Sequence, residues 1–331
     1  MTDPLVSVKM MTYNHAPYIG QAIEGVLQQK TSFPFELVIG EDCSTDGTRE
    51  IVFNYQKKYP DIIRVITSDR NVGMTANSRR TTKACRGKYI AFCEGDDYWH
   101  HPEKLQKQVD YMETHPECGL IFADCDIFYE KTKKIIKNFN YLKGYRNIIN
   151  LTAEEALMGG MVRFTCTAVV RWSMAEQIIE NDPYLHQSGV FLMGDTQLWT
   201  ELALQTMVTY MPEAMGTYRV LKNSASRNID SKKYYRFLKS ASEMRLYLCE
   251  KHKLSDDLRQ KVDLDWCDSC LRLAYLERNV NLANEVLLKK KKLNWKEWIR
   301  YYGSQNIAIH YSYRVGAFFL ALLRGKNKQW P

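Results

Sequence analysis

The chain has 331 residues, of which 45% are hydrophobic and 25% are charged. This composition excludes a disordered or low-complexity chain, and the length exceeds the ~100 to 200 residues of a typical domain, so we expect one large domain with an appendage. The formal net charge of +8 indicates an anionic partner.

Alternating strand and helix patterns start near the amino terminus. Residues 5–11 and 35–39 predict strands, and apolar positions at helical spacing predict a helix between them. Ser44 and Asp46 offer acceptors for the start of a second helix, which Pro60 ends. A third strand is predicted over residues 62–67.

The same alternation continues to about residue 130. We expect helices over residues 75–85 and 102–113 and strands over residues 89–92 and 120–129. This pattern predicts an α/β fold, with a mostly parallel, Rossmann-like sheet covered by helices on both faces. In such sheets ligands bind beyond the carboxyl ends of the strands.

The pattern changes after residue 150. Thr152 and Glu155 predict a capping box, residues 164–170 a strand, and Asp195 the start of a helix. Strand signals stop after about residue 231, so we expect a domain over 1–230 and a helical region over 231–331.

Nine cysteines are scattered along the chain, several within apolar runs. Reduced thiols buried in a core have this distribution, which indicates a reducing compartment. Cys267 and Cys270 form a CxxC inside a helical pattern without a second pair, so we interpret them as packing residues. The first residues resemble no secretory signal, and we expect a cytoplasmic protein.

Three carboxylates crowd the stretch after the strand at 89–92: Glu94, Asp96 and Asp97. Like charges this close are costly unless a cation lies among them. Carboxylates are hard ligands, so the cation would be Mg²⁺ or Mn²⁺. The alternative is a solvated turn that caps the helix beginning at Pro102.

Four motifs in order carry a family resemblance. They are Thr12-Tyr13-Asn14, Gly40-Glu41-Asp42-Cys43-Ser44-Thr45-Asp46-Gly47-Thr48, Asn71-Val72-Gly73 and Glu94-Gly95-Asp96-Asp97. Residues 5–130 closely resemble the family 2 glycosyltransferases, which are inverting sugar transferases with the GT-A fold. The resemblance weakens toward residue 220. It implies that residues 1–130 bind the nucleotide-sugar and that residues 131–230 face the acceptor.

The resemblance implies a role for each motif. Tyr13 would stack on the base, with Thr12 and Asn14 beside it, and Asp42 would accept the imide N–H of uracil or thymine. Arg70 would lie near the base or the diphosphate. The alternatives are a buried aromatic ring for Tyr13 and a solvated loop charge for Arg70.

In the acidic stretch, the resemblance implies that Asp96 binds the ribose and that Asp97 holds a divalent ion between the two phosphates. Asp96 is also a candidate ligand of that ion, and Glu94 is a candidate for binding the nucleotide-sugar. Glu94 stands where the family usually has Asp. Glu41, Asp124 and Asp126 are weaker candidates for donor or acceptor contacts.

An inverting transferase needs a base that deprotonates the acceptor hydroxyl. Asp195, at the start of a predicted helix, matches the family's base in spacing and context; an ordinary helix cap is the alternative. Many relatives carry a histidine in the loop corresponding to residues 218–227, and this chain has none there. Lys222 or Arg227 could contact the diphosphate instead, or the loop is a solvated basic one.

The carboxy-terminal helices raise a separate question. Residues 315–323, VGAFFLALL, are too short to span a bilayer, which takes ~20 residues. Basic residues and tryptophans flank them, a mixture typical of a helix in a membrane interface. Packing on the catalytic domain or on a second subunit is the alternative.

The sequence therefore predicts a metal-dependent transferase that moves a sugar from a UDP-sugar, or alternatively a dTDP-sugar, to a glycan or lipid-linked saccharide in cell-surface polysaccharide synthesis. A catalytically silent binding subunit and a nucleotidyltransferase are the alternatives. A nucleic-acid partner is not expected, because the basic residues cluster at one end without stacking aromatics near the crevice.

Overall fold

The computed structural model describes residues 3–146, 148, 150–159, 161, 163–221, 230–290 and 292–312. The chain divides into two compact units, each of which is described by itself. The first consists of Met1–Gln187 with Gly194–Lys222, and the second of Ser188–Met193 with Asn223–Pro331.

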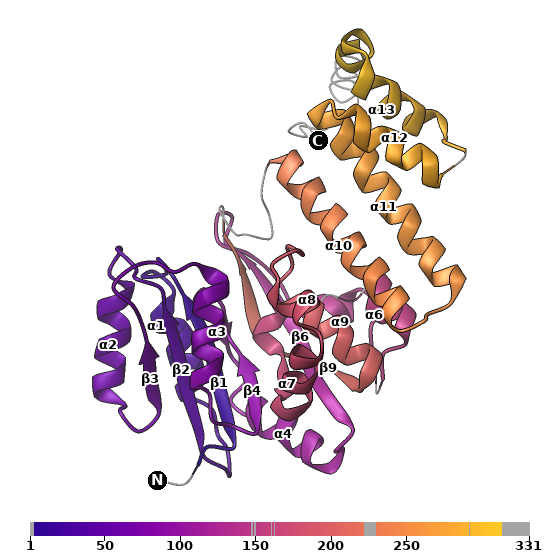
Figure 1. Cartoon of the computed structure of the whole chain (residues 1–331). Coiled ribbons are helices and arrows are strands. Elements are labelled where there is room, and N and C mark those ends of the chain that lie inside the picture. Colours follow the sequence, from indigo (N-terminus) through magenta and orange to yellow (C-terminus); the bar gives the residue numbers. More distant parts are fainter. Residues whose placement is uncertain are drawn as a thin grey trace. The chain divides into compact units, whose positions relative to one another are not determined.

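A nine-stranded sheet forms the centre of the first unit (Figure 1). Its order is β3-β2-β1-β4-β8-β6-β9-β5, and β7 pairs with β6. The strands are β1 Val6–Thr12, β2 Phe35–Glu41, β3 Ile63–Ile66, β4 Tyr89–Phe92, β5 Tyr98–Trp99, β6 Cys118–Tyr129, β7 Lys134–Ile136, β8 Val169–Arg171 and β9 Met207–Val220.

The first four strands in chain order are parallel, as predicted, and β6 is parallel to β9. The rest of the sheet is less regular. Strand β8 lies between β4 and β6 and is antiparallel to both. Strand β5 pairs antiparallel with β9, and β7 pairs antiparallel with β6. The strand predicted over 164–170 is shifted, because a 3-10 turn, Thr165–Thr167, takes up its first half.

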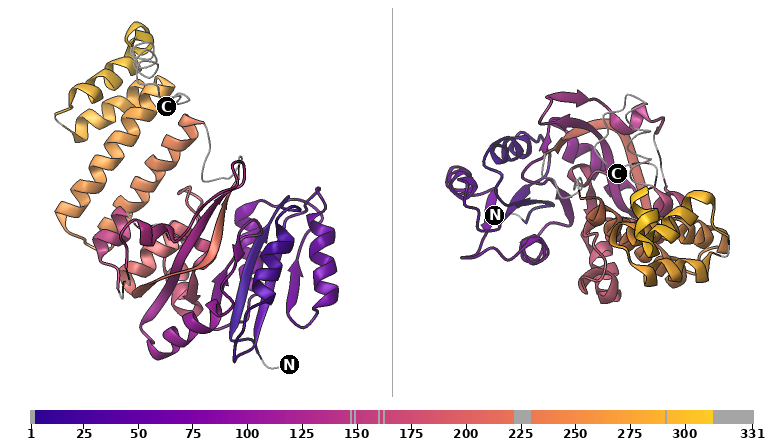
Figure 2. Two further views of the ribbon diagram at one scale, coloured as in Figure 1. Left: turned by 180° about the vertical axis from the view of Figure 1, so that it is seen from behind. Right: turned by 90° about the horizontal axis from the view of Figure 1, so that it is seen from above.

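Helices cover both faces of the sheet (Figure 2). Val8 and Met10 of β1 pack in one core with residues of α1, α2 and α4, whereas Lys9, of opposite parity, reaches Ser78 of α3 on the other face. Helices α7 and α9 pack on that second face. The bounds are α1 Ile19–Leu27, α2 Thr48–Lys58, α3 Met74–Ala84, α4 Lys104–Thr114, α5 Phe139–Leu142, α6 Ala153–Met158, α7 Trp172–Asn181, α8 Pro183–Gln187 and α9 Asp195–Gln205.

Local signals for helix starts were partly right. The predicted capping box of Thr152 and Glu155 is present at α6. At α2 the residue before the helix is Gly47, at φ 96°. Asp46 accepts the Thr48 N–H at 3.1 Å, whereas the Ser44 hydroxyl accepts from the Asn14 N–H at 3.0 Å and so joins two loops. The segment between β2 and α2 thus both caps the helix and contacts the loop that follows β1.

The second unit is helical, as expected: α10 Ser231–Lys251, α11 Asp256–Glu277, α12 Val280–Lys289 and α13 Trp295–Gln305. Cys267 and Cys270 are free and buried in its core on α11, which agrees with a packing role. In the part of the chain that the structure describes, no helix is both long and apolar enough to cross a membrane. The segment 315–323 lies outside the described residues.

Candidate active site

The acidic stretch forms a turn that continues alongside β1. Past the end of β4, the N–H of Cys93 donates to Lys9 O at 3.1 Å and the N–H of Gly95 donates to Met11 O at 2.8 Å. A Cβ atom on Gly95 would lie 2.7 Å from Thr12 Oγ1, so only glycine fits this close approach. The three acids are therefore held at the carboxyl ends of β1 and β4, where the fold predicts a ligand site.

The three acids of this turn differ in environment. Asp97 is 4% exposed, and its Oδ1 accepts the backbone N–H of Arg219 at 2.8 Å. Its burial, with Cys166, Asp96 and Glu94 nearby, raises the pKa of Asp97 well above its usual range. The Asp97 carboxylate, which the sequence predicted to hold an ion, is thus surrounded by protein atoms.

Asp96 and Glu94 are the more accessible acids. Asp96 is partly exposed, and its carboxylate makes no hydrogen bond or ion pair with any residue that the structure describes. Loss of water around Glu94, reinforced by Asp195 and Asp96, raises the pKa of Glu94 to about 8. Oε2 of Glu94 is buried and lacks a partner among the described residues. No group of three or more His, Cys, Asp or Glu residues that could hold a metal is found in the described ranges.

The segment after β1 forms the exposed part of the site. Tyr13 is 45% exposed, which leaves its ring open for stacking and excludes the buried alternative. Asn14 has a φ of 55°, and its Oδ1 accepts the Thr45 N–H at 2.9 Å. Thr12 is buried, and its Oγ1 has no partner among the described residues. The segments that follow β1 and β2 are thus linked around Tyr13.

Asp42 connects this region to the loop that follows β3. Its Oδ1 accepts the Val72 N–H at 2.9 Å and its Oδ2 accepts the Gly73 N–H at 3.0 Å. The Arg80 guanidinium lies 3.5 Å from Oδ1. Asp42 is 3% exposed, so it fixes the loop beside the exposed Arg70. The structure thus brings the Asp42 and Arg70 regions together.

Asp195 is the exposed first residue of α9. Its Oδ2 accepts the Thr165 hydroxyl, and its Oδ1 accepts the Thr196 N–H at 2.7 Å. Asp195 also contributes to the raised pKa of Glu94, so the two carboxylates belong to one electrostatic neighbourhood. Thr165 was missed by sequence reasoning, because nothing in a predicted strand marks a hydroxyl that meets a helix start 30 residues later.

A buried lysine also belongs to this neighbourhood. Lys9 Nζ donates to Ser78 Oγ at 2.7 Å. Burial lowers the pKa of Lys9, while Cys85, Glu94 and Asp195 oppose that shift. A cation on β1 therefore offsets part of the negative charge of the acids.

The weaker candidates, Glu41, Asp124 and Asp126, each accept a backbone N–H from a neighbouring segment. Glu41 Oε1 accepts the Ser44 N–H at 2.6 Å, and Asp124 Oδ1 accepts the Asn140 N–H at 2.9 Å. Asp126 Oδ1 accepts the Asn138 N–H at 3.0 Å. All three are buried, so their carboxylates hold loops in place. Lys222 and Arg227 lie outside the described residues.

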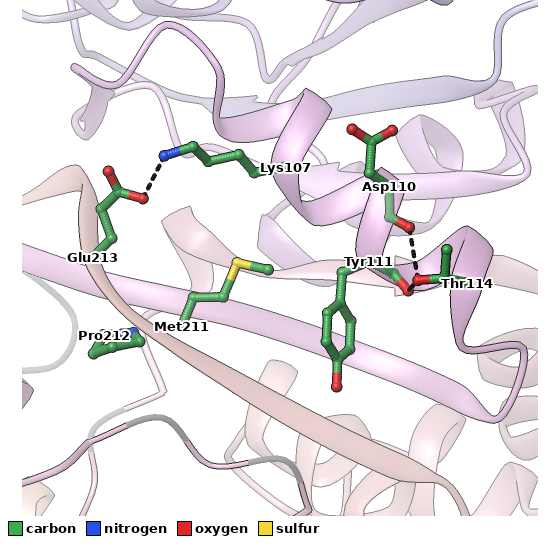
Figure 3. Close-up of a pocket in the computed structure, with 7 residues that line it drawn as sticks. All are labelled: Lys107, Asp110, Tyr111, Thr114, Met211, Pro212 and Glu213. Carbon is green, nitrogen blue, oxygen red and sulfur yellow. Dashed lines mark hydrogen bonds and ion pairs between the residues drawn. The ribbon is translucent and has the colours of Figure 1, made fainter.

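A pocket between α4 and β9 is distinct from this site (Figure 3). In it, Lys107 and Glu213 form an ion pair at 2.7 Å above Met211 and Tyr111. It contains none of the predicted site residues.

Comparisons with known sequences give one family. Residues 7–167 match the model described as Glycosyl transferase family 2. An uncharacterized protein of Mycobacterium tuberculosis is 42% identical over 218 residues, which is 65% of this chain and 58% of that protein. The chain thus spans less than two thirds of this relative. TuaG of Bacillus subtilis, named as a glycosyltransferase of teichuronic acid biosynthesis, is 28% identical over 68% of this chain and 82% of TuaG.

Solved structures share the fold at low identity. S. aureus TarS 1-349 in complex with UDP-GlcNAc has a TM-score of 0.56 and 18% identity, over 90% of this chain and 79% of that one. The mannosyltransferase PcManGT from Pyrobaculum calidifontis, in complex with GDP-Man and Mn²⁺, has a TM-score of 0.56 and 14% identity, over 94% of this chain and 87% of that one. The predicted GT-A fold with a helical carboxy-terminal region is confirmed.

Proposed function

Because residues 7–167 match the model of glycosyl transferase family 2, we propose that this chain is an inverting glycosyltransferase of that family, which moves a sugar from a UDP-sugar to a hydroxyl group. The observation that carries the proposal is that a partly exposed carboxylate without a partner among the described residues, Asp96, and an exposed one, Asp195, belong to one electrostatic neighbourhood. The Asp96 carboxylate would bind a cation, and the Asp195 carboxylate would take the proton of the attacking hydroxyl.

Asp96 rather than Asp97 is the carboxylate that we propose for the cation. Asp97 is buried and bonded to backbone, whereas the Asp96 oxygens make no bond with described residues. Hard carboxylate oxygens fit Mg²⁺ or Mn²⁺, and PcManGT was solved with Mn²⁺. When bound, such a cation supplies positive charge to the leaving diphosphate. Asp97 would then position the turn.

Asp195 would act as the general base. The Thr165 hydroxyl and the Thr196 N–H both donate to its carboxylate and so orient it. An oriented carboxylate can take the proton of an acceptor hydroxyl as that oxygen attacks the anomeric carbon. Glu94, beside Asp195, would line the path of the donor sugar.

The nucleotide would lie over the segments after β1 and β2. Tyr13 offers an exposed ring for the base, flanked by Thr12 and Asn14. Asp42 would accept the imide N–H of uracil in addition to its backbone bonds, and Arg70 would lie near the diphosphate. TarS was solved with UDP-GlcNAc, which supports a UDP-sugar, with a dTDP-sugar as the alternative. The name of TuaG supports an acceptor in cell-surface polysaccharide synthesis, a glycan or a lipid-linked saccharide.

Thermal unfolding with nucleoside diphosphates tests the donor half. We expect UDP at ~100 times its dissociation constant to stabilise the protein by about 2.7 kcal/mol in the presence of Mn²⁺, and far less without it. Asp96→Ala should abolish the metal-dependent part. Asp110→Ala, which removes an acid in the pocket of Figure 3, is the matched control and should retain it. Absence of any shift with UDP, dTDP or GDP would contradict the proposal. UDP binding without UDP release from any UDP-sugar would favour the silent binding subunit.

The second unit carries a surface that suits a membrane interface. On α13, the side chains of Trp295, Trp298 and Tyr302 are 66%, 37% and 48% exposed, and spacings of three and four residues place them on one helix face. Lys292 and Lys296 are exposed nearby. Trp and Tyr next to Lys are typical of helices at the headgroup level of a bilayer. We therefore propose peripheral attachment to a cytoplasmic membrane face.

Co-sedimentation with vesicles tests this attachment. We expect the protein to bind vesicles that contain phosphatidylserine and to dissociate at high salt, because exposed lysines attract anionic lipid. The double variant Trp295→Ala with Trp298→Ala should bind at least about tenfold more weakly, since it loses two interfacial aromatics. Equal sedimentation of both proteins would contradict the proposal, and a dimer lost only in the variant would assign the same surface to a second subunit.

A further inference from the structure

Arg219 lies near the carboxyl end of β9 and is 6% exposed. Each nitrogen of its guanidinium group has its own acceptor. Nε donates to the backbone oxygen of Asp96 at 2.8 Å, Nη1 to Glu130 Oε2 at 2.8 Å and Nη2 to Gln21 Oε1 at 2.7 Å. Three segments far apart in sequence therefore meet at one side chain: the acidic turn, the end of β6 and the start of α1.

Aromatic rings enclose the same cation. The guanidinium carbon lies 4.8 Å from the ring centre of Tyr18, 5.3 Å from that of Tyr98 and 5.4 Å from that of Phe128. Rings at these distances stabilise a buried cation. With an acceptor at each of its three nitrogens, its charge paired with Glu130 and only 6% of the residue exposed, the Arg219 side chain is engaged by protein groups rather than presented to a phosphate group. The role of Arg219 must therefore lie in the residues that its side chain holds in place.

Arg219 holds two consecutive residues of the acidic turn. Its side chain binds the backbone oxygen of Asp96, and its own N–H binds the carboxylate of Asp97 at 2.8 Å. The pairing of β5 with β9 brings Tyr98 opposite Thr217, which sets this register. The bond to the Asp96 oxygen holds the plane of the peptide after Asp96, and the bond to the Asp97 carboxylate holds the next residue, so together they restrict the backbone from which the Asp96 side chain projects.

We propose that Arg219 is the positioning residue of the cation site: it orients Asp96 toward the metal and the diphosphate without touching either. This inference rests on the proposed function. A ligand held in the productive direction before the cation arrives loses less freedom on binding, so affinity rises. Removing the Arg219 side chain should therefore weaken the binding of the cation more than the binding of the nucleotide.

The test is a Mn²⁺ titration of UDP-dependent stabilisation in Arg219→Met. This variant keeps the backbone bond to Asp97 and removes only the side-chain clamp. We expect the Mn²⁺ concentration at half effect to rise about tenfold, the size of one hydrogen bond to a charged group. UDP binding without metal should change less than about twofold, a difference below the scale of one such bond. UDP release in turnover should show the same rise in metal requirement.

Arg171→Met is the matched control. Arg171 is also buried, lies 5.2 Å from the ring centre of Tyr89, and donates to the backbone oxygens of Cys118, Met112 and His115. Its partner in the sheet is the first residue of β4, at the end of that strand remote from the acidic turn. We expect Arg171→Met to lower the unfolding midpoint while the Mn²⁺ requirement stays at the wild-type value.

Further outcomes decide the proposal. If Arg219→Met does not fold, Arg219→Lys replaces it, because a single ammonium cannot reach all three acceptors and should give an intermediate rise. A wild-type Mn²⁺ requirement in the folded variant, or an equal rise in Arg171→Met, would overturn the positioning role. A wild-type protein that binds UDP without any metal dependence would instead count against the proposed function, so the two failures are distinguishable.

Discussion

Asp195→Asn should lower the turnover number for UDP release from the preferred UDP-sugar by about 10² to 10⁴-fold, the usual contribution of a general base. Asparagine has nearly the same shape: its Oδ1 can accept the Thr196 N–H, and its amide NH2 can donate to the Thr165 hydroxyl, which reverses that bond but keeps the start of α9. It cannot take a proton at neutral pH. The loss should therefore appear in turnover, with the Mn²⁺-dependent affinity for UDP within about twofold of wild type.

Thr165→Val gives the graded control for this result. Valine fills the same space but does not donate to Asp195, so the base loses one of the contacts that orient it and keeps those from Thr196. We expect the turnover number for UDP release to decrease about tenfold, which is the effect of one lost hydrogen bond to a charged group. Activity of Asp195→Asn above a tenth of wild type would contradict the assignment and direct attention to Glu94, whose pKa of about 8 lets it exchange a proton near neutrality.

The amino-terminal half of the fold could be predicted because its signals are local. Val6, Val8 and Met10 alternate with the polar Ser7 and Lys9, and Ile19 and Ile23 recur at helical spacing, so β1 and α1 follow from periodicity alone. The acids after β4 and the polar residues after β1 and β2 mark strand ends in the same way. Their meeting at one edge of the sheet then follows from parallel pairing.

The environments of the acids could not be predicted, because they depend on β9. Arg219 is 122 residues away from Asp97 in sequence, and its strand was not among those expected. Without that pairing nothing distinguishes Asp96 from Asp97: the sequence predicted Asp97 as the ligand of the ion, with Asp96 as a second candidate, and the structure buries Asp97. The signal that the sequence offered was Arg219 itself, a charged residue near the end of a largely apolar stretch.

Strand β8 shows a second limit of local reasoning. Its three residues pair antiparallel with β4 and β6, and this insertion places Thr165 beside Asp195. Sequence periodicity predicts a strand there, but neither its neighbours nor its direction. The contact that orients the proposed base is therefore a product of topology.

Lys104 should make stability depend on pH, because a charged amine is costly to bury. It is fully buried on α4, where Nζ donates to Gln108 Oε1 at 2.7 Å and lies 4.1 Å from the centre of the Trp99 ring. Burial lowers the pKa of Lys104 from 10.5 to about 7, although the thiols of Cys93, Cys166 and Cys125 oppose the shift. This shift corresponds to a cost of the order of 5 kcal/mol.

The sign of the pH dependence follows from proton binding. Below about pH 7 the folded and unfolded states both carry the charge, so the full cost is present. Between about pH 7 and 10.5 the unfolded state binds more protons than the folded one, so the free energy of unfolding rises with pH. Lys104→Met removes the charge and should flatten this rise, with its largest advantage over wild type at low pH.

Urea unfolding of both proteins at pH 6.5, 8 and 9.5 would measure this effect. We expect the free energy of unfolding of Lys104→Met to exceed that of wild type by several kcal/mol at pH 6.5, less the hydrogen bond lost by Gln108. The excess should shrink as the pH rises. Other titrating groups cancel in the difference. Lys107→Met is the control, because Lys107 lies on the same helix as Lys104 but is partly exposed and pairs with Glu213 of β9. Parallel curves for Lys104→Met and wild type would contradict the buried charge, because a lost hydrogen bond alone shifts stability equally at every pH.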